Sequence, residues 1–355
     1  CIAMDQGFVR CNKTAGEDLD RIGRLVNGIR NFEPEGQMRQ VLPGLLTNLG
    51  NALASYGLLA QAGDCLRKGI ELDPANLTCH SNLNLLLNYQ VDIPSSQSYD
   101  QARLFGRHLE GLISPSQPHV RPLEPGQKRL RVGYVSADLY THSVTYFLEP
   151  LLSQHDHARF EIICYAGSGY TDDTTKRLES YADEWRSLAN LNAAQAAKMI
   201  SEDNIDILVD LNGHTANNRL EVFAYKPAPI QVTWLGYPNT TGLSRLDYRL
   251  TDKLSDPEGV DPFYTERLYR LGDGFLCYRP PEINLIPAAP PCEKNRVITF
   301  GSFNTLQKIT DEVMACWAQI ISHVPGSRLL IKSKKLSNPE IMERTKTRLK
   351  KAGID

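Results

Sequence analysis

The stretch from Ile205 to Asp252 constrains the fold of this chain more than any other part of the sequence. Two largely apolar runs, Ile205–Leu211 and Ile230–Leu235, and a weaker one, Tyr248–Leu250, alternate with turn-forming residues. This is the pattern of buried parallel strands. The first two runs end in polar clusters, which comprise residues 212–215 and 237–242. Ligands of open α/β sheets bind beyond the carboxyl ends of the strands, so we expect the chemistry of the protein there.

The composition excludes several classes of protein. The chain has 355 residues, of which 41% are hydrophobic and 23% charged, enough for two or three domains. With a net charge of -2, the chain has no excess of positive charge for binding nucleic acid or an acidic membrane. No apolar run reaches the roughly 18 residues of a membrane span. The eight cysteines form no Cys-x-x-Cys pair, so we expect reduced cysteines of an intracellular protein.

A helical repeat precedes the sheet pattern. Small and apolar residues fall at the offsets of a tetratricopeptide unit, which has a period of about 34 residues. They are Leu46, Leu49, Gly50, Leu53, Ala62, Leu66, Gly69 and Pro74. At least three stacked units are expected, so most of the array should precede Cys1, and we expect the chain to be a fragment of a longer protein. The repeats predict either a concave platform for partner proteins or a plain helical hairpin packed on the next domain.

From Leu130 onward, strand-length apolar runs alternate with helical segments, which predicts a doubly wound, mainly parallel sheet. Its predicted strands are 131–136, 160–166, 205–211, 230–235 and 248–250, with helices over 144–154, 193–202 and 220–224. A second α/β pattern has strands over 297–303 and 328–332 around a helix over 310–324. The predicted organisation is helical repeats over 1–92, a helix and Pro-rich linker over 93–127, a first α/β lobe over 128–279, a linker over 280–296 and the start of a second, truncated lobe over 297–355.

Missing motifs narrow the chemistry. The first strand leads into Ser136–Asp138 rather than a Gly-x-Gly-x-x-Gly turn, and no Gly-x-x-x-x-Gly-Lys-Ser/Thr loop occurs. The segment His155–His157 has no further Cys or His at ligand spacing, so we interpret it as a surface loop. The sequence therefore predicts a metal-independent reaction without a cofactor.

Four segments carry a resemblance to a known family. They are Thr141–Phe147, Asp206–Leu220, Pro227–Leu243 and Phe300–Thr310. These segments resemble the catalytic region of the intracellular protein O-glycosyltransferases with tetratricopeptide repeats, and the match covers roughly Leu130 to Lys332. The sequences of Gly213–Asn218 and Pro238–Gly242, together with the short linker between the lobes, favour the SPINDLY-type protein O-fucosyltransferases over the O-GlcNAc transferases.

The resemblance implies a Rossmann-type, two-lobe fold of the GT-B kind. It also implies transfer of a sugar from a nucleotide-sugar donor to Ser or Thr of cytoplasmic and nuclear proteins, which the repeat array would hold. GDP-fucose is the favoured donor, UDP-GlcNAc the alternative, and a repeat scaffold with an inactive transferase lobe the alternative of another class. Because the donor base and ribose lie mainly on the second lobe, we expect this chain alone to bind nucleotide weakly and to turn over negligibly.

The resemblance also implies roles for single residues. Lys308 looks like the family's lysine that faces the donor diphosphate, where a fixed cation stabilises the leaving group. Asn304, on the same loop, would orient that lysine or the phosphate. His142 resembles the active-site histidine near the acceptor hydroxyl, and His214 holds the equivalent place after the third predicted strand. Either histidine could accept a proton or orient the substrates, and which one is the base stays open.

The turn at Asn239, Thr240 and Thr241 offers amide and hydroxyl groups for sugar hydroxyls or the acceptor backbone, but a purely structural turn is an equal interpretation. Tyr237 is expected to line the cleft, and Trp234 to belong to the core. Asp138 and Asp210 are interpreted as caps or turn acceptors. We expect the loops at His142, His214 and Lys308 to line one groove between the two lobes.

Overall fold

The computed structural model describes residues 37–116, 129–280 and 288–354, together with residues 26, 28 and 286. The chain divides into two compact units. One takes in Cys1–Cys79, Tyr89–Asp92 and Asn284–Asp355, and the other takes in His80–Asn88 and Ile93–Ile283. Among the described helices, none combines the length and the apolar character needed to cross a bilayer.

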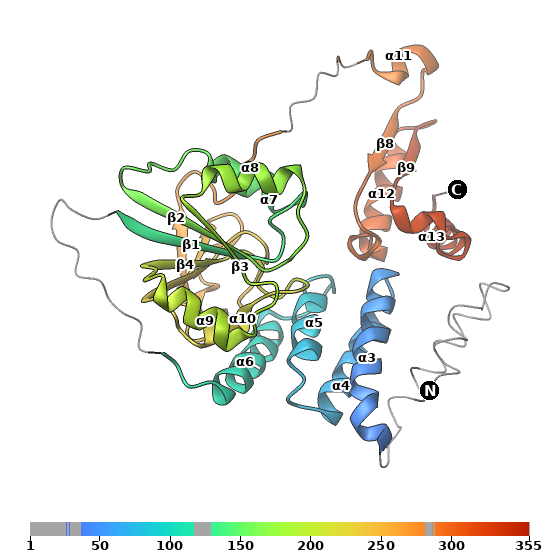
Figure 1. Cartoon of the computed structure of the whole chain (residues 1–355). Coiled ribbons are helices and arrows are strands. Elements are labelled where there is room, and N and C mark those ends of the chain that lie inside the picture. The colour runs from blue at the N-terminus through green and yellow to red at the C-terminus, as the bar shows by residue number, and fades with distance from the viewer. Residues whose placement is uncertain are drawn as a thin grey trace. The chain divides into compact units, whose positions relative to one another are not determined.

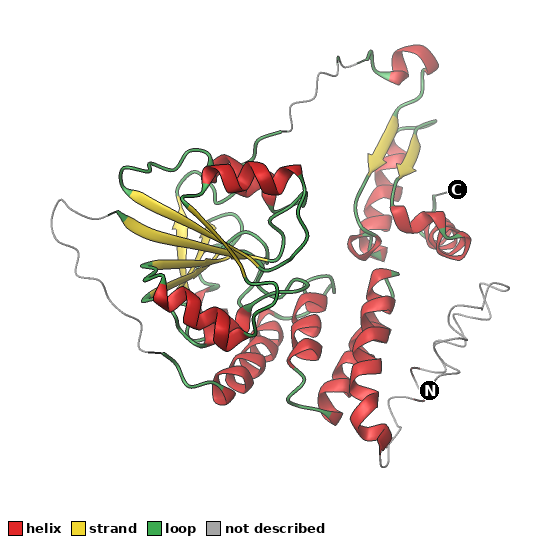
Figure 2. Cartoon of the chain, in the orientation of Figure 1, coloured by secondary structure: helices red, strands yellow, loops and turns green. Residues whose placement is uncertain are grey.

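A seven-stranded sheet forms the centre of the second unit (Figures 1 and 2). The strands are β1 (Leu130–Ser136), β2 (Phe160–Ala166), β3 (Glu184–Ser187), β4 (Ile207–Asp210), β5 (Ile230–Thr233), β6 (Tyr248–Asp252) and β7 (Arg267–Leu271). All neighbouring strands are parallel, in the order β3-β2-β1-β4-β5-β6-β7. The doubly wound parallel sheet predicted from the sequence is confirmed.

The two edge strands were missing from the predicted set. β3 and β7 carry no continuous apolar run, because an edge strand is only partly covered: Glu184–Arg186 are half-buried, and Arg267 and Tyr269 are exposed. Helix α8 (Asp173–Tyr181) was also missed, although Asp172 and Thr175 form a capping box at its start. Hydrophobic periodicity detects buried strands more readily than partly exposed strands and helices such as these.

Helices cover both faces of the sheet. Figure 1 shows α7 (Thr145–Leu152) and α8 on one face, and α9 (Ala193–Glu202) and α10 (Leu220–Ala224) on the other. Apolar side chains of β1, β2 and β4 pack with Leu148, Leu152 and Leu178 from α7 and α8 in one buried cluster. Trp234 lies in the same cluster, 5% exposed, which agrees with its interpretation as a core residue.

Helix α6 (Ser95–Leu112) belongs to the same unit as the sheet. Its backbone approaches the turn after β5 so closely that a Cβ on Gly106 would lie 1.9 Å from the Gly242 carbonyl oxygen, and a Cβ on Gly242 would lie 1.9 Å from the Ala102 carbonyl oxygen. Glu110 also accepts hydrogen bonds from Ser244 and from the backbone of Arg245. Helix α6 therefore packs directly on the sheet's unit, and the predicted boundary near residue 127 lies outside the described residues.

The first unit contains the helical hairpin of α3 (Gln37–Ser55) and α4 (Leu59–Leu72). Gly50 allows the two helices to approach, because a Cβ there would lie 2.8 Å from Cγ of Leu66. Helix α5 (Leu77–Leu87) follows, and the division between the units passes through it. The small residues that the repeat pattern placed at the helix crossing therefore lie at a real contact.

The same unit contains a second α/β segment. The parallel strands β8 (Thr299–Ser302) and β9 (Arg328–Ile331) are connected through α12 (Asp311–His323), and α13 (Pro339–Lys351) follows. The short helix α11 (Pro291–Asn295) precedes β8. This strand-helix-strand pattern was predicted to within two residues at each end.

Candidate active site

The order of the sheet reverses between β1 and β4, so the loops after these two strands form its topological switch point. Both loops carry polar side chains. Asn212, after β4, donates from its amide to Asp138, after β1, over 2.7 Å, and its amide oxygen accepts from the backbone N–H of Ala137 over 2.8 Å. Asn212 therefore ties the two loops together at the place where open α/β sheets bind ligands.

His142 lies on the loop after β1, and its side chain is 39% exposed. Its Nδ1 is 3.9 Å from the Asp138 carboxylate. The loop is held by Asp172, which accepts from the backbone N–H of Thr141 over 2.9 Å. The ring of Tyr140 lies 5.9 Å from the His142 ring. A substrate hydroxyl can reach this imidazole from solvent.

His214 is in a different environment, because it is only 1% exposed. Its Nε2 is 2.9 Å from the carbonyl oxygen of Thr241, and its Nδ1 is 2.9 Å from the hydroxyl of Ser81. Burial lowers the pKa of His214 to about 3, so the ring is neutral at physiological pH. The two predicted histidines thus differ: one is open to solvent beside a carboxylate, and the other is enclosed with both nitrogens in contact with polar groups.

Asp210 closes the end of β4. Its carboxylate accepts from the backbone N–H groups of Asn212 and Gly213, over 3.1 and 2.9 Å, and from the hydroxyl of Thr233 over 2.8 Å. Burial raises its pKa to about 6. These bonds agree with its interpretation as a turn acceptor, and they set the position of Asn212.

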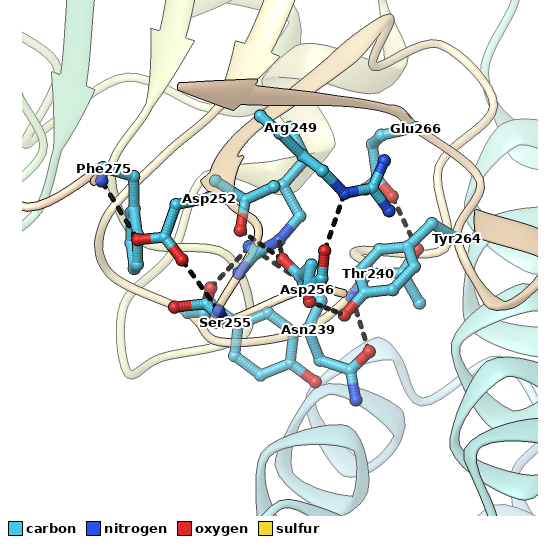
Figure 3. A network of polar contacts seen from close by, with 12 residues as sticks. Asn239, Thr240, Arg249, Asp252, Ser255, Asp256, Tyr264, Glu266 and Phe275 are labelled. Atoms are coloured by element: carbon cyan, nitrogen blue, oxygen red, sulfur yellow. Dashed lines mark hydrogen bonds and ion pairs between the residues drawn. The ribbon is translucent and has the colours of Figure 1, made fainter. Parts of the chain in front are cut away.

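The predicted binding residues on the turn after β5 are bonded to other residues of the protein, and Figure 3 shows Asn239 and Thr240 in a network of polar contacts. Thr240 and Thr241 are fully buried, and both hydroxyls donate to the carboxylate of Glu266. Asn239 donates to the side-chain oxygen of Asn88 over 3.1 Å, and Tyr237 is 3% exposed. The geometry favours the structural interpretation of this turn, and a binding role for its residues stays a prediction.

A buried ion pair supports the same turn (Figure 3). Arg249, 2% exposed, donates to Asp256 over 3.2 Å and to the carbonyl oxygen of Tyr237 over 2.8 Å. The hydroxyl of Tyr264 donates to the other oxygen of Asp256 over 2.6 Å. Sequence reasoning missed Arg249 and Glu266. A charged residue inside the apolar run Tyr248–Leu250 was the available signal for Arg249, since buried charges require partners.

Lys308 and Asn304 lie in the other unit, on the segment that follows β8. Lys308 ends the short 3-10 helix η2 (Leu306–Lys308), and both side chains are exposed. Arg348 fixes the next residues, since it donates to the Ile309 carbonyl oxygen over 2.9 Å and pairs with Asp311 over 2.7 Å. Lys308 is thus presented to solvent on an anchored loop.

A hollow of about 540 Å³ lies beside that loop, at the carboxyl ends of β8 and β9. Asn304 lines it together with Lys332, Lys334 and Lys335. These lysines lie at the carboxyl ends of a parallel strand pair. Such a basic hollow is suited to an anion such as a phosphate.

His155 and His157, interpreted from the sequence as part of a surface loop, are both bonded to other side chains. Nε2 of His155 is 2.9 Å from the Tyr134 hydroxyl, and Nδ1 of His157 is 2.9 Å from Asp183. Within the described part of the chain, no three His, Cys, Asp or Glu side chains are grouped as a metal site would require.

Comparison with known proteins identifies the family. The model of glycosyl transferase family 41 matches residues 101–278, half of the chain. The chain is 39% identical over 291 residues to the probable UDP-N-acetylglucosamine–peptide N-acetylglucosaminyltransferase SPINDLY of Arabidopsis thaliana, covering 80% of the chain and 32% of that protein. The SPINDLY protein of Petunia hybrida is 38% identical over 291 residues, covering 81% of the chain and 31% of that protein. The chain therefore spans about a third of the length of these relatives.

A solved structure gives the same result. A lysine-to-methionine mutant of the Thermobaculum terrenum O-GlcNAc transferase matches with a TM-score of 0.81 and 35% sequence identity, over 88% of this chain and 59% of that one. This likeness agrees with a GT-B-like lobe built on the parallel sheet. The chain belongs to glycosyl transferase family 41.

Proposed function

We propose that this chain is part of a protein O-glycosyltransferase, which transfers a sugar from a nucleotide-sugar donor to Ser or Thr hydroxyls of intracellular proteins. The observation that carries the proposal is the family 41 match over a doubly wound sheet, with a solvent-open histidine at the switch point. Its relatives of known name are glycosyltransferases that act on peptides.

The proposed reaction is direct displacement at the anomeric carbon. The acceptor hydroxyl forms the new bond, the bond to the donor diphosphate breaks, and the diphosphate leaves with the bonding electrons. His142, exposed beside Asp138, accepts the hydroxyl proton, and the Asp138 carboxylate stabilises the resulting imidazolium. Lys308 supplies a fixed cation for the leaving diphosphate, and the basic hollow beside it receives the nucleotide phosphates. We propose no metal ion for this step.

The donor we favour is GDP-fucose, because residues 213–218 and 238–242 resemble the SPINDLY-type sequences. UDP-GlcNAc is the second candidate, and the names of the SPINDLY relatives favour it. A scaffold with an inactive lobe is the candidate of another class, and the presence of His142 and Lys308 argues against it.

Acceptor proteins are proposed to bind a tetratricopeptide array, of which the α3–α4 hairpin is one unit and α5 the start of the next. The repeat offsets from Leu46 to Pro74 and the close approach at Gly50 support this. A cytoplasmic and nuclear location follows from the same proposal. The six described cysteines are free thiols, as in a reducing compartment.

The deciding experiment incubates the protein that carries this sequence with an acceptor protein and either labelled GDP-fucose or labelled UDP-GlcNAc. Incorporation from one donor that falls about a thousandfold in Lys308→Met would support the proposal and identify the sugar. Lys294→Met, on the short helix α11 before β8, is the matched control and should retain activity. No incorporation from either donor would leave the scaffold interpretation.

A further inference from the structure

His214 is a buried titratable side chain that the proposed reaction does not use, and its surroundings come from three separate elements. Ser81 of α5 and the Thr241 carbonyl oxygen contact its two nitrogens. Phe105 of α6 and Tyr237 of the turn after β5 pack edge-on against its ring, at centroid distances of 4.7 and 5.1 Å. His214 itself lies on the loop after β4 and so joins that loop to three other parts of the unit.

The hydrogen bonds define the tautomer. A carbonyl oxygen only accepts, so Nε2 carries the proton and donates to Thr241. The Ser81 hydroxyl accepts from the side-chain amide of Asn218 over 3.1 Å, which leaves its own proton free to donate to Nδ1 over 2.9 Å. The neutral ring therefore satisfies one acceptor and one donor at the same time. Neither a phenylalanine nor a charged imidazolium can do so.

One face of α5 continues the contact. Ser81, Asn84 and Asn88 follow one another at spacings of three and four residues, which places them on the same side of a helix. The Asn84 carbonyl oxygen accepts from the Tyr237 hydroxyl over 3.1 Å. The amide of Asn88 donates to the same hydroxyl over 3.0 Å. This polar face binds the loop after β4 and the turn after β5 together.

The loop that His214 fixes also carries Asn212, two residues earlier. Asn212 holds the Asp138 carboxylate at the switch point, and that carboxylate is the charge beside His142. A hydrogen bond thus joins α5 to His214, two residues of backbone lead from His214 to Asn212, and a second hydrogen bond joins Asn212 to Asp138.

We infer that His214 is a positioning residue: it locks the loop after β4 to α5 and thereby holds Asn212 and Asp138 in place beside His142. The helical segment α5–α6 is then a supporting part of the site rather than only the end of a binding platform. The kinetic consequence of this inference depends on the proposed function, whereas its structural consequence does not.

The test compares three variants with the parent protein by amide hydrogen exchange and by transfer kinetics. His214→Phe keeps the ring packing and removes both polar contacts. His214→Gln keeps a side-chain amide that can donate to Thr241, and Ser81→Ala removes only the contact to Nδ1. Should His214→Phe not fold, the other two variants carry the test.

We expect exchange at residues 212–215 and 240–243 to become about tenfold faster or more in His214→Phe, with smaller effects in His214→Gln and Ser81→Ala. We expect kcat to fall about tenfold or more at every pH, with donor KM near that of the parent, because misplaced groups slow the step without weakening donor binding. Combining Ser81→Ala with His214→Phe should add little, since both remove the same contact.

Two results would overturn the inference. One is unchanged exchange in all three variants. The other is a His214→Phe protein with parental exchange but an altered pH dependence of kcat, which would make His214 a proton carrier. If the parent transfers no sugar, the proposed function is wrong, and the positioning role is then tested by amide hydrogen exchange alone.

Discussion

At the scale of single residues, His142 and His214 show how strongly burial decides what a side chain can do. Both follow parallel strands next to the switch point, but His142 is open to solvent and His214 is enclosed. A general base must reach the proton that it removes, so the exposed residue is the better candidate.

The first prediction concerns His142. His142→Gln should lower kcat for sugar transfer by about a hundredfold to ten-thousandfold, the usual contribution of a general base. Transfer assays at saturating donor and acceptor measure the effect. His157→Gln, on an exposed histidine bonded to Asp183, is the matched control, and an equal loss there would contradict the assignment.

The second prediction concerns Asp210 and the pH dependence of stability. Burial raises its pKa from the ordinary 3.8 to about 6, so between these values the folded protein binds more protons than the unfolded chain. The contribution of Asp210 to the free energy of unfolding is therefore complete below pH 4 and declines as pH rises to 6, by on the order of 3 kcal/mol.

Asp210→Asn does not titrate, so the difference in unfolding free energy between the parent and this variant should shrink from pH 4 to pH 7. Urea unfolding at several pH values measures it. A difference that stays constant across this range would show that Asp210 ionises normally in the folded protein.

At the scale of secondary-structure elements, the contact between α6 and the turn after β5 is made by two glycines. Gly106 has no room for a side chain, because a Cβ would meet the Gly242 carbonyl oxygen at 1.9 Å. Gly242 has a φ of +80°, which also favours glycine. The helix therefore packs on this turn backbone to backbone.

The third prediction uses two glycines of the same helix. Gly106→Ala should destabilise the protein by about 1–3 kcal/mol or more, because the helix must move away from the turn. Gly111→Ala has open space around it and should be neutral or stabilising by up to about 1 kcal/mol, since alanine favours helix. Thermal unfolding of both variants decides, and equal effects would mean that α6 does not pack as described.

At the scale of the whole molecule, the unit that contains the sheet includes the last turns of α5 and all of α6. Arg245 donates to the Ile113 and Glu110 carbonyl oxygens, and His214 bonds to Ser81, so the sheet and these helices share buried polar contacts. Removing the helices would leave these groups without partners, at a cost of about 1–3 kcal/mol each.

The fourth prediction follows from that arrangement. A fragment over residues 77–280 should unfold in one cooperative transition, whereas a fragment over 129–280, close to the boundary that the sequence suggested, should unfold at a lower temperature or aggregate. Calorimetry and size-exclusion chromatography measure both outcomes. Equal stability of the two fragments would show that α5 and α6 are dispensable for the fold.

Much of the architecture could be predicted from the sequence, because local patterns specify it. Buried parallel strands need continuous apolar runs, and β2, α9 and α10 were predicted with their observed ends. The edge strands β3 and β7 were not predicted, because partly exposed strands have no continuous apolar run. The polar clusters after β4 and β5 could be placed at one edge of the sheet, because parallel strands end on the same side of the sheet.

The sequence by itself determined the alternation of strands and helices, the position of the polar loops and the resemblance to a family. Only the tertiary structure decided which polar residues face solvent. The sequence placed Thr240, Thr241 and His214 among the candidate site residues. In the structure they are buried by Glu266, Ser81 and α6, which lie from 25 to more than 130 positions away in the chain. Burial depends on contacts between residues that are distant in the chain, and a local sequence pattern does not specify those contacts.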